Sequence, residues 1–304
     1  TATWTVPGGE GPKQVQARYV DGAGNISPDY NATVVMDNTP PTAAASSPAV
    51  APAASITVTW SGADALSGVA SYDLQVRDSD GPWTPWLAHT TALTAIYSGA
   101  SRHLYSFRVR ATDNVGNLGA YRDAGDTFTL ADGELALRPL AAGWNLVSLA
   151  ISPAMTLTAQ DLLDAVAAGG GNAVQVAAWQ EGAWLVHAAG EAGPGFPLEA
   201  GRGYFVRAAA PSTWAFAGLS YTAPFSLSLA GGWNLVSVPQ GSGVTTAQGL
   251  AQRLQDQGGS PRQVLRWRAG AWDGYLVGTG ASGFAIEPGR GYFVYCENAS
   301  VWSP

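Results

Sequence analysis

Few side chains in this sequence have the chemistry of a catalytic or metal-binding group. The three histidines, His89, His103 and His187, are far apart and lack a metal-ligand spacing such as His-x-x-x-His. Cys296 is the only cysteine, so an intrachain disulfide is excluded. We expect Cys296 to be a small, half-buried strand residue rather than a reactive thiol, and the histidines to lie at surface or turn positions. The sequence thus predicts no catalytic residue, no metal ligand and no cofactor.

Two acid–base pairs recur at matching places. Glu199 precedes Arg202, and Glu287 precedes Arg290, each within a Gly-Arg-Gly turn. A carboxyl group beside a guanidinium could serve in acid catalysis, but a surface ion pair next to a strand is the expectation. The Gly-Arg-Gly segments lack the spacing of a phosphate-binding loop and lead into a strand, not a helix.

Two loops combine aspartate, asparagine and glycine. One is Asp-Asn-Val-Gly-Asn at residues 113–117, and its counterpart 92 residues earlier is Asp-Gly-Ala-Gly-Asn at residues 21–25. Oxygen ligands of this kind suit calcium. The favoured interpretation is a hairpin turn in which the aspartate binds its own backbone and glycine adopts a positive φ angle.

Two pairs of tryptophans flank predicted two-residue turns. Trp179 and Trp184 surround Glu181-Gly182, and Trp267 and Trp272 surround Ala269-Gly270. In such a hairpin, the two tryptophans of a pair face each other across the strands. A cross-strand aromatic pair contributes about 0.5–1.5 kcal/mol, enough to fix the register of a small module. The alternative is that the pairs form a platform on which sugar rings stack.

Composition narrows the class of protein. The chain of 304 residues has 12% charged and 46% hydrophobic residues, with 38 glycines, 19 prolines and 12 tryptophans. Such a balance favours β-rich modules with many turns. A net charge of -7 and a single lysine, Lys13, argue against nucleic acid as a partner. Membrane insertion is not expected, because the sequence contains no run of about 20 apolar residues. Any export signal would lie upstream of Thr1.

Residues 43–131 are predicted to form one β-sandwich. Apolar and polar residues alternate at 56–60, 72–77 and 104–112, and the last segment places Tyr105, Phe107, Val109 and Ala111 on one face. Together with Trp60, the Tyr-Ser-Phe-Arg-Val-Arg-Ala run at 105–111 resembles a fibronectin type III domain. Residues 72–86 are similar to a variety of that domain that is common in large bacterial surface proteins.

The N-terminal segment resembles the last strands of a second, Ig-like module. Its Asp-Asn loop and Arg18 match residues 113–117 and Arg110, whereas counterparts of the earlier strands are absent. Two or three strands are not expected to fold alone, because one face and one edge stay uncovered. We therefore expect the strands carrying Val15, Ala17, Tyr19 and Val34 to be completed by another subunit or by a longer parent chain. Residues 37–42, with Pro40 and Pro41, are predicted to be a stiff linker.

The C-terminal half is an internal duplication. Gly-Trp-Asn-Leu-Val-Ser at 143–148 returns at 232–237, and Gly-Arg-Gly-Tyr-Phe-Val at 201–206 returns at 289–294. Between them, residues 158–166 and 246–254 are predicted helices with Thr158 and Thr246 as N-caps. Asn145 and Asn234 are expected to hydrogen-bond to nearby backbone. These repeats resemble a module seen near the C-termini of bacterial surface and secreted proteins. The resemblance implies that this chain is displayed outside the cell.

The predicted architecture is mainly β. It consists of Ig-like and fibronectin III-like sandwich modules at 1–40 and 41–132, followed by two small α+β repeats at 133–219 and 220–304. We expect a non-catalytic, extracellular or cell-surface bacterial protein with a structural or adhesive role, as a surface-layer, stalk or filament subunit. Its partners would be copies of itself or a parent polypeptide. The alternative is a glycan-binding region of a larger secreted enzyme.

Overall fold

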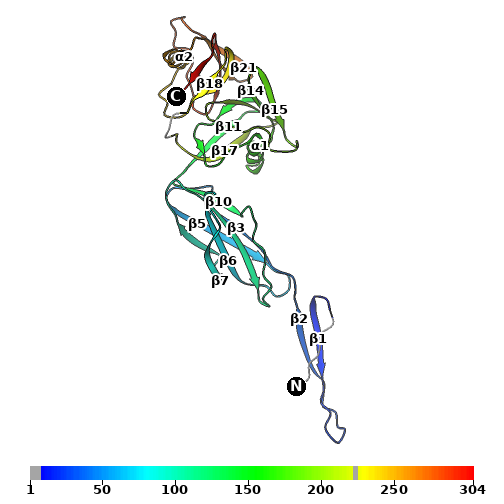
Figure 1. Cartoon of the computed structure of the whole chain (residues 1–304). Helices are drawn as coiled ribbons and strands as arrows, with labels where there is room; N and C mark the ends of the chain where they lie inside the picture. Colours follow the sequence, from blue (N-terminus) through cyan, green and yellow to red (C-terminus); the bar gives the residue numbers. More distant parts are fainter. Residues whose placement is uncertain (1–7, 222–224) are drawn as a thin grey trace. The chain divides into compact units, whose positions relative to one another are not determined.

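The computed structural model describes residues 8–221 and 225–304 and confirms a mainly β chain. Residues on either side of the Asp132–Gly133 bond belong to two compact units, which are described one at a time (Figure 1). The predicted repeats at 133–219 and 220–304 both belong to the second unit. Neither helix in the described part of the chain is long and apolar enough to cross a membrane. Trp4, in the predicted N-terminal module, lies outside the described residues.

The N-terminal hairpin joins β1 (Gly11–Ala17) and β2 (Tyr30–Met36) in antiparallel register. Among the described residues, these strands form a sheet of their own. Because side chains alternate along a strand, Val15 and Ala17 share one face with their cross-strand neighbours Ala32 and Tyr30. Polar residues predominate on the other face, where the Gln14 side chain donates a hydrogen bond to Thr33 Oγ1 and Val35 is the main apolar exception. The first face is mainly apolar, with Lys13 opposite Val34.

A sandwich of two sheets forms the rest of the first unit (Figure 1). Its strands pair antiparallel, except for β10 and β4, which are parallel. One sheet contains, in spatial order, β4 (Val50–Ala51), β10 (Thr127–Ala131), β9 (Leu104–Asp113), β6 (Val69–Asp78) and β7 (Thr84–Thr90). The other contains β3 (Thr42–Ser46), β5 (Ser55–Ala63) and β8 (Thr94–Ser98). The predicted apolar face of residues 104–112 is confirmed, since Tyr105, Phe107, Val109 and Ala111 are buried in the core with Trp60.

The first repeat is built from one helix and two sheets. Its elements are β11 (Glu134–Leu140), β12 (Gly143–Ser148), β13 (Ser152–Pro153), α1 (Ala159–Ala168), β14 (Ala173–Gln180), β15 (Ala183–Ala188), β16 (Gly203–Ala208) and β17 (Ser212–Leu219). The larger sheet has the order β12-β16-β14-β15, and the smaller one β11-β17-β13. The amide of Asn145 binds the carbonyl oxygens of Ala141 and Gly143 within 3.1 Å, as the sequence predicts.

The second repeat follows the same plan. Its elements are β18 (Leu227–Leu229), β19 (Gly232–Ser237), α2 (Ala247–Asp256), β20 (Pro261–Arg268), β21 (Ala271–Leu276), β22 (Gly291–Cys296) and β23 (Ser300–Trp302). The four-stranded sheet has the matching order β19-β22-β20-β21. Asn234 binds the carbonyl oxygens of Ala230 and Gly232 in the same way as Asn145 does in the first copy.

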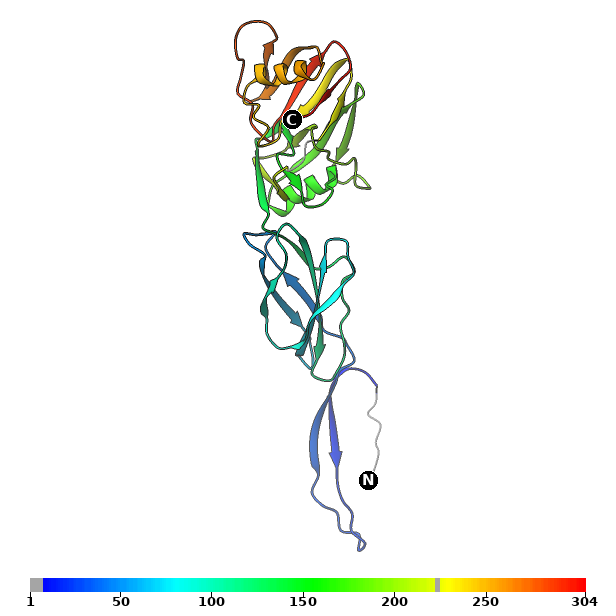
Figure 2. The ribbon, with the colours of Figure 1, turned by 60° about the vertical axis from the view of Figure 1, so that its left-hand side comes forward.

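Each helix begins at the predicted N-cap. Thr158 accepts a hydrogen bond from the Asp161 backbone and the Asp161 carboxylate accepts one in return, which is a capping box. Thr246 accepts from the Gly249 backbone, and the glycine leaves no side chain to return the bond. In Figure 2, the two helices lie on opposite outer sides of the second unit, with the sheets between them. Each helix covers one face of its own four-stranded sheet.

Cys296 lies in β22, opposite Gly232, and is completely buried, deeper than the half-burial that the sequence predicts. Its counterpart in the first repeat is Ala208, which is also buried. Burial raises the pKa of the Cys296 thiol, so the thiol stays protonated at neutral pH. This residue therefore packs as a small apolar side chain.

Candidate functional site

The three histidines lie in separate environments. His103 Nδ1 is 2.9 Å from the Asp78 carboxylate, His187 Nε2 is 2.7 Å from Gln160 Oε1, and His89 is exposed. Over residues 8–221 and 225–304, clusters able to hold a metal ion through histidine, cysteine or carboxylate ligands include none of the three. His187 is buried, so the expectation that it lies at the surface is wrong, whereas His89 and His103 are exposed. The structure does not gather the three histidines into a site.

Both Glu–Arg pairs form ion pairs at the start of a strand. The Nε atom of Arg202 is 2.5 Å from the Glu199 carboxylate, and that of Arg290 is 2.7 Å from the Glu287 carboxylate. The hydrogen bond from Arg290 lowers the pKa of Glu287, which keeps this carboxyl group ionised rather than available as an acid. Next to the second pair, the Tyr292 hydroxyl accepts a hydrogen bond from the Glu287 backbone, and burial raises the pKa of Tyr292 to about 12. These residues hold a turn in place.

The Asp-Asn loops are hairpin turns, as the favoured interpretation has it. Asp113 Oδ1 accepts hydrogen bonds from the backbone N–H groups of residues 115–117, and Asp113 Oδ2 accepts from the Asn117 side chain. Asp21 makes the equivalent bonds to Asn25, and Gly24 and Gly116 have positive φ angles. The aspartate of each loop therefore satisfies backbone donors of its own turn.

Asp113 also belongs to a cluster of three carboxylates that the sequence does not predict. One oxygen each of Asp37, Asp64 and Asp113 lies within 4.8 Å of the others. Such oxygens are the ligands that calcium prefers. However, Asp37 accepts hydrogen bonds from the backbone of Thr39 and Ser67, and Asp64 Oδ1 accepts from the backbone of residues 66–68. Backbone N–H groups of the protein therefore donate hydrogen bonds to the carboxylates of this cluster.

These hydrogen bonds predict a pH dependence of the first unit. Burial raises the pKa values of Asp73 and Asp113, but hydrogen bonds outweigh it and leave both below the ordinary value of 3.8. For Asp73 these bonds come from the His89 backbone and the Arg110 side chain, and for Asp113 from the Asn117 side chain and the backbone of residues 115–117. Ionised carboxylates then stabilise the fold above that value, and their protonation removes this contribution as pH falls through the lowered values. We expect the melting temperature of this unit to be level at neutral pH and to fall below about pH 4.

Calorimetric scans between pH 7 and pH 3 test this prediction. The matched variant is Asp113→Asn, which keeps an oxygen acceptor but does not titrate. Its melting temperature should depend less steeply on pH in the acid range than that of the wild type. Parallel curves for the two proteins would show that Asp113 does not carry the effect.

The second unit joins the two repeats through the sheet faces that the helices leave uncovered. Leu146, Ala177 and Phe205 from the first repeat share one core with Leu235 and Phe293 from the second. The contacts are reciprocal: Ser148 N–H donates to Gly289 O at 2.9 Å, and Ser237 N–H donates to Gly201 O at 2.7 Å. Reciprocity of this kind is the pattern of a symmetric dimer, here formed within one chain.

Each Trp pair has the predicted register. Trp179 lies directly opposite Trp184, and Trp267 opposite Trp272, with ring centroids 5.1 Å and 5.0 Å apart. Both turn residues between the strands have positive φ angles, 52° and 79° in the first hairpin, as a type I′ turn requires. The prediction of two cross-strand aromatic pairs is therefore confirmed.

The inner and outer tryptophans of each pair have different environments. The Trp179 indole N–H donates to Trp233 O at 2.9 Å, and the Trp267 indole N–H donates to Trp144 O at the same distance. Each inner tryptophan thus binds the backbone of the opposite repeat. The outer tryptophans, Trp184 and Trp272, are each 47% exposed. The inner tryptophans therefore connect the two repeats, whereas the outer tryptophans are partly exposed to solvent.

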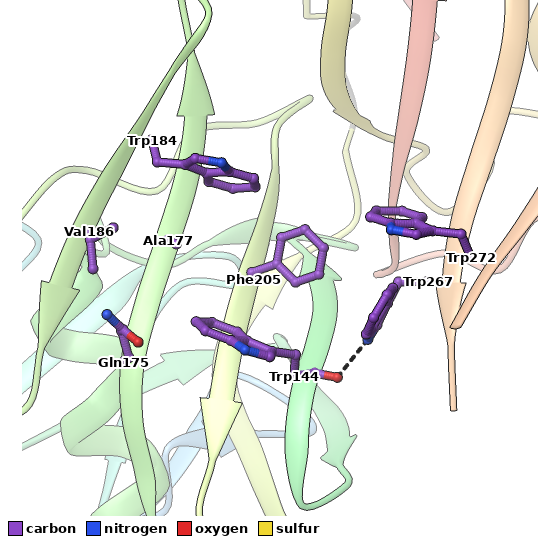
Figure 3. A pocket seen from close by; sticks show the side chains of 8 residues that line it. All are labelled: Trp144, Gln175, Ala177, Trp184, Val186, Phe205, Trp267 and Trp272. Carbon is purple, nitrogen blue, oxygen red and sulfur yellow. Dashed lines mark hydrogen bonds between the residues drawn. The ribbon is translucent and has the colours of Figure 1, made fainter. Parts of the chain in front are cut away.

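Between the sheets lies a cleft of about 470 Å³, which we call the first aromatic slot (Figure 3). Four tryptophans line it: Trp144, Trp184, Trp267 and Trp272. Phe205 lies at its centre, with ring centroids within 6.1 Å of all four indoles. Gln175, Ala177 and Val186 complete the lining. The volume is that of a small-ligand site.

The other half of the same interface holds a smaller counterpart, the second aromatic slot, of about 250 Å³. Trp233 and Phe293 take the places of Trp144 and Phe205, and Leu265 takes that of Ala177. Leu265 lies opposite Gly274, where the first repeat has Ala177 opposite Val186. The Leu265 side chain extends over Gly274, because a Cβ atom added at Gly274 would lie 2.9 Å from Leu265 Cδ2.

The structure thus brings together all four predicted stacking residues, Trp179, Trp184, Trp267 and Trp272, on one interface. The sequence did not predict that Trp144, Phe205 and Ala177 belong to it. The Gly-Tyr-Phe-Val segments do indicate a second buried face, because consecutive apolar residues are typical of a strand that is buried on both faces. Val15, Ala17 and Val34 lie on strands of the N-terminal hairpin, in the other unit. Tyr19 does not, because β1 ends at Ala17, so its predicted place on a strand is wrong.

Comparisons with known proteins give little further guidance. No protein-family model and no curated protein matches this sequence. Among solved structures, the FN1–FN3 domains of chicken CNTN1 are 12% identical over 87% of this chain and 97% of that chain, with a TM-score of 0.23. At that identity and TM-score, no function carries over from the one protein to the other.

Proposed function

We propose that this chain is a non-catalytic structural or adhesive protein, displayed outside a bacterial cell and assembled through its N-terminal hairpin. The hairpin is completed by strand addition, in which a strand of a neighbouring copy pairs with the edge of β1 that no described strand occupies and covers its mainly apolar face. One observation carries this proposal: Tyr30 and Val34 on the mainly apolar face of the β1–β2 hairpin are exposed, although the matching face of the sandwich is buried.

Comparison of the two hairpins supports this assignment. The loop at 21–25 aligns with that at 113–117, which places Val15 at the position of Phe107 and β1 at that of β9. Phe107 is completely buried, and β9 pairs along both edges, with β6 and β10. By contrast, Tyr30 and Val34 on the apolar face are 59% and 45% exposed. An isolated two-stranded hairpin is marginal in water, so a covering strand stabilises it.

Light scattering of the full chain over a range of concentrations tests the assembly. We expect a molar mass above the 31.3 kDa of the monomer, rising with concentration. The double variant Val15→Lys/Val34→Lys puts two charges on the apolar face and should be monomeric. Gln14→Lys/Thr33→Lys puts the same charges on the polar face and should assemble like the wild type. A mass of 31.3 kDa for the wild type at every concentration would refute the proposal.

A second candidate function, glycan binding by the paired repeats, has its own support. Trp184 and Trp272 each expose 47% of their surface next to an open aromatic slot. Large exposed apolar patches are unusual on a soluble protein and commonly mark a binding surface. Calorimetric titration of the full chain with a panel of polysaccharides tests this role. Absence of heat with every polysaccharide would leave the tryptophans with their structural role alone.

A further inference from the structure

The two aromatic slots of the second unit are related by the duplication but are not equivalent. Trp144 and Phe205 in the first slot correspond to Trp233 and Phe293 in the second. The difference lies beneath the rings, where the first slot has Ala177 and the second has Leu265. The first slot has a volume of about 470 Å³ and the second a volume of about 250 Å³. The first slot is therefore the roomier of the two.

The lining of the first aromatic slot restricts the charge of that ligand. None of the residues that line it carries a charge, and most of the lining is indole and phenyl carbon. A carboxylate or phosphate ligand would find no cation there, and an ammonium ligand would find no counter-ion. Burial of an uncompensated charge is costly, so the slot favours a neutral ligand.

The shape of the slot restricts the ligand further. Trp144 and Trp184 contact opposite sides of Phe205, with ring centroids 6.0 Å and 5.7 Å from it (Figure 3). Both indoles are partly exposed, at 40% and 47%. They thus present flat apolar surfaces to the slot, which suits a ring with an apolar face.

One polar side chain reaches the opening. Gln175 lies on β14, two residues before Ala177, and its amide lines the slot beside Trp144 (Figure 3). Within the part of the chain that the structure describes, the Gln175 amide makes no side-chain hydrogen bond. An amide both donates and accepts, and so does a hydroxyl group. A pyranose ring meets both requirements, because its C–H face is apolar and its edge carries hydroxyl groups.

We propose that the first aromatic slot is a subsite for one pyranose ring of a neutral glycan, which stacks on Trp144 and Trp184 and hydrogen-bonds to Gln175. This assignment rests on the glycan-binding role proposed for the paired repeats. Ala177 leaves room for the ring in the first slot, whereas Leu265 lines the smaller second slot of about 250 Å³. The ring lies at the interface of the two repeats, since Trp267 and Trp272 come from the second repeat.

Titration of the full chain with neutral hexasaccharides of glucose, N-acetylglucosamine, xylose and mannose tests the subsite. Calorimetry gives affinity and stoichiometry, and tryptophan fluorescence reports contact with the indoles. For the probe that binds, we expect one site per chain. Trp144→Ala should weaken binding at least tenfold, whereas Trp233→Ala, its counterpart in the second slot, should leave the affinity unchanged.

Exchange of the residue pairs between the slots gives the sharper control. The variant Ala177→Leu/Val186→Gly copies the pair that the second repeat already contains, so it should fold, and it should lose binding. The reverse exchange, Leu265→Ala/Gly274→Val, should raise the stoichiometry from one to two. Trp233→Ala then also serves to separate the slots, because it should remove only the added site.

The outcomes separate this proposal from the role on which it rests. Binding that is equally sensitive to Trp144→Ala and Trp233→Ala, or insensitive to Ala177→Leu/Val186→Gly, would place the glycan elsewhere and overturn the subsite alone. Neither heat nor a fluorescence change with any probe would overturn the subsite and the glycan-binding role together. Assembly through the β1–β2 hairpin is measured by light scattering, so its failure is recognised independently.

Discussion

Replacing Trp302 by alanine is expected to lower the free energy of unfolding of the second unit by about 3–5 kcal/mol. Trp302 is completely buried in the core of the second repeat, and its indole N–H donates to Ser237 O at 2.9 Å. The substitution removes a large apolar side chain and leaves a cavity that the surrounding residues fill only in part. It also deprives a buried carbonyl oxygen of a donor.

Denaturant unfolding of the full chain, followed by circular dichroism, measures this effect. Trp302→Phe is the matched control, because it keeps an aromatic ring in the core but loses the second ring of the indole and the N–H donor. We expect it to cost about 1–3 kcal/mol, less than alanine, because a buried carbonyl oxygen loses its donor while part of the ring volume is kept. Equal stability of the alanine variant and the wild type would show that β23 does not belong to the core.

The second large effect is expected where the two repeats come closest. A Cβ atom added at Gly291 would lie 2.9 Å from Cγ and Cδ1 of Leu146 and 3.1 Å from the Cα atom of Gly203. Real Cβ contacts are longer, so the two sheets would have to move apart. We expect Gly291→Ala to cost about 1–3 kcal/mol of unfolding free energy, as overpacking of a core does.

Gly249→Ala is the control within the same unit. Its added Cβ atom also has a close neighbour, Thr246 Oγ1 at 3.3 Å, but the first repeat carries Asp161 at the matching helix position and accommodates its side chain. Because alanine is the better helix former, this variant should be as stable as the wild type or up to about 1 kcal/mol more stable. If both variants had the same stability, the close approach of the sheets at Gly203 and Gly291 would be wrong.

Local features of the repeats could be predicted because short-range patterns determine them. Glu181-Gly182 between two strands specifies a tight turn, which fixes Trp179 opposite Trp184, and Thr158 before an apolar periodic segment specifies a helix N-terminus. In the same way, alternation along residues 104–112 identified the face that is buried in the sandwich. None of these inferences requires knowledge of what covers the other side of a strand.

The joined face of the repeats could not be predicted in this way. Alternation divides the side chains of β14 and β16 between two faces, and it identifies the face toward α1 through Val176 and Val206. It does not tell what covers Ala177 and Phe205 on the other face, because that partner lies nearly 90 residues away. The cluster of Asp37, Asp64 and Asp113 was missed for the same reason, since three loops that are distant in sequence form it.

The two tryptophans of each pair have separate environments, since the inner one joins the repeats and the outer one is exposed to solvent. Hydrogen exchange of the indole N–H groups in ¹H–¹⁵N spectra of the full chain tests this claim most directly, with signals assigned through single Trp→Phe variants. We predict slow exchange for Trp179 and Trp267, whose N–H groups donate to Trp233 O and Trp144 O, and fast exchange for Trp184 and Trp272. Equally fast exchange of all four indoles would contradict the claim.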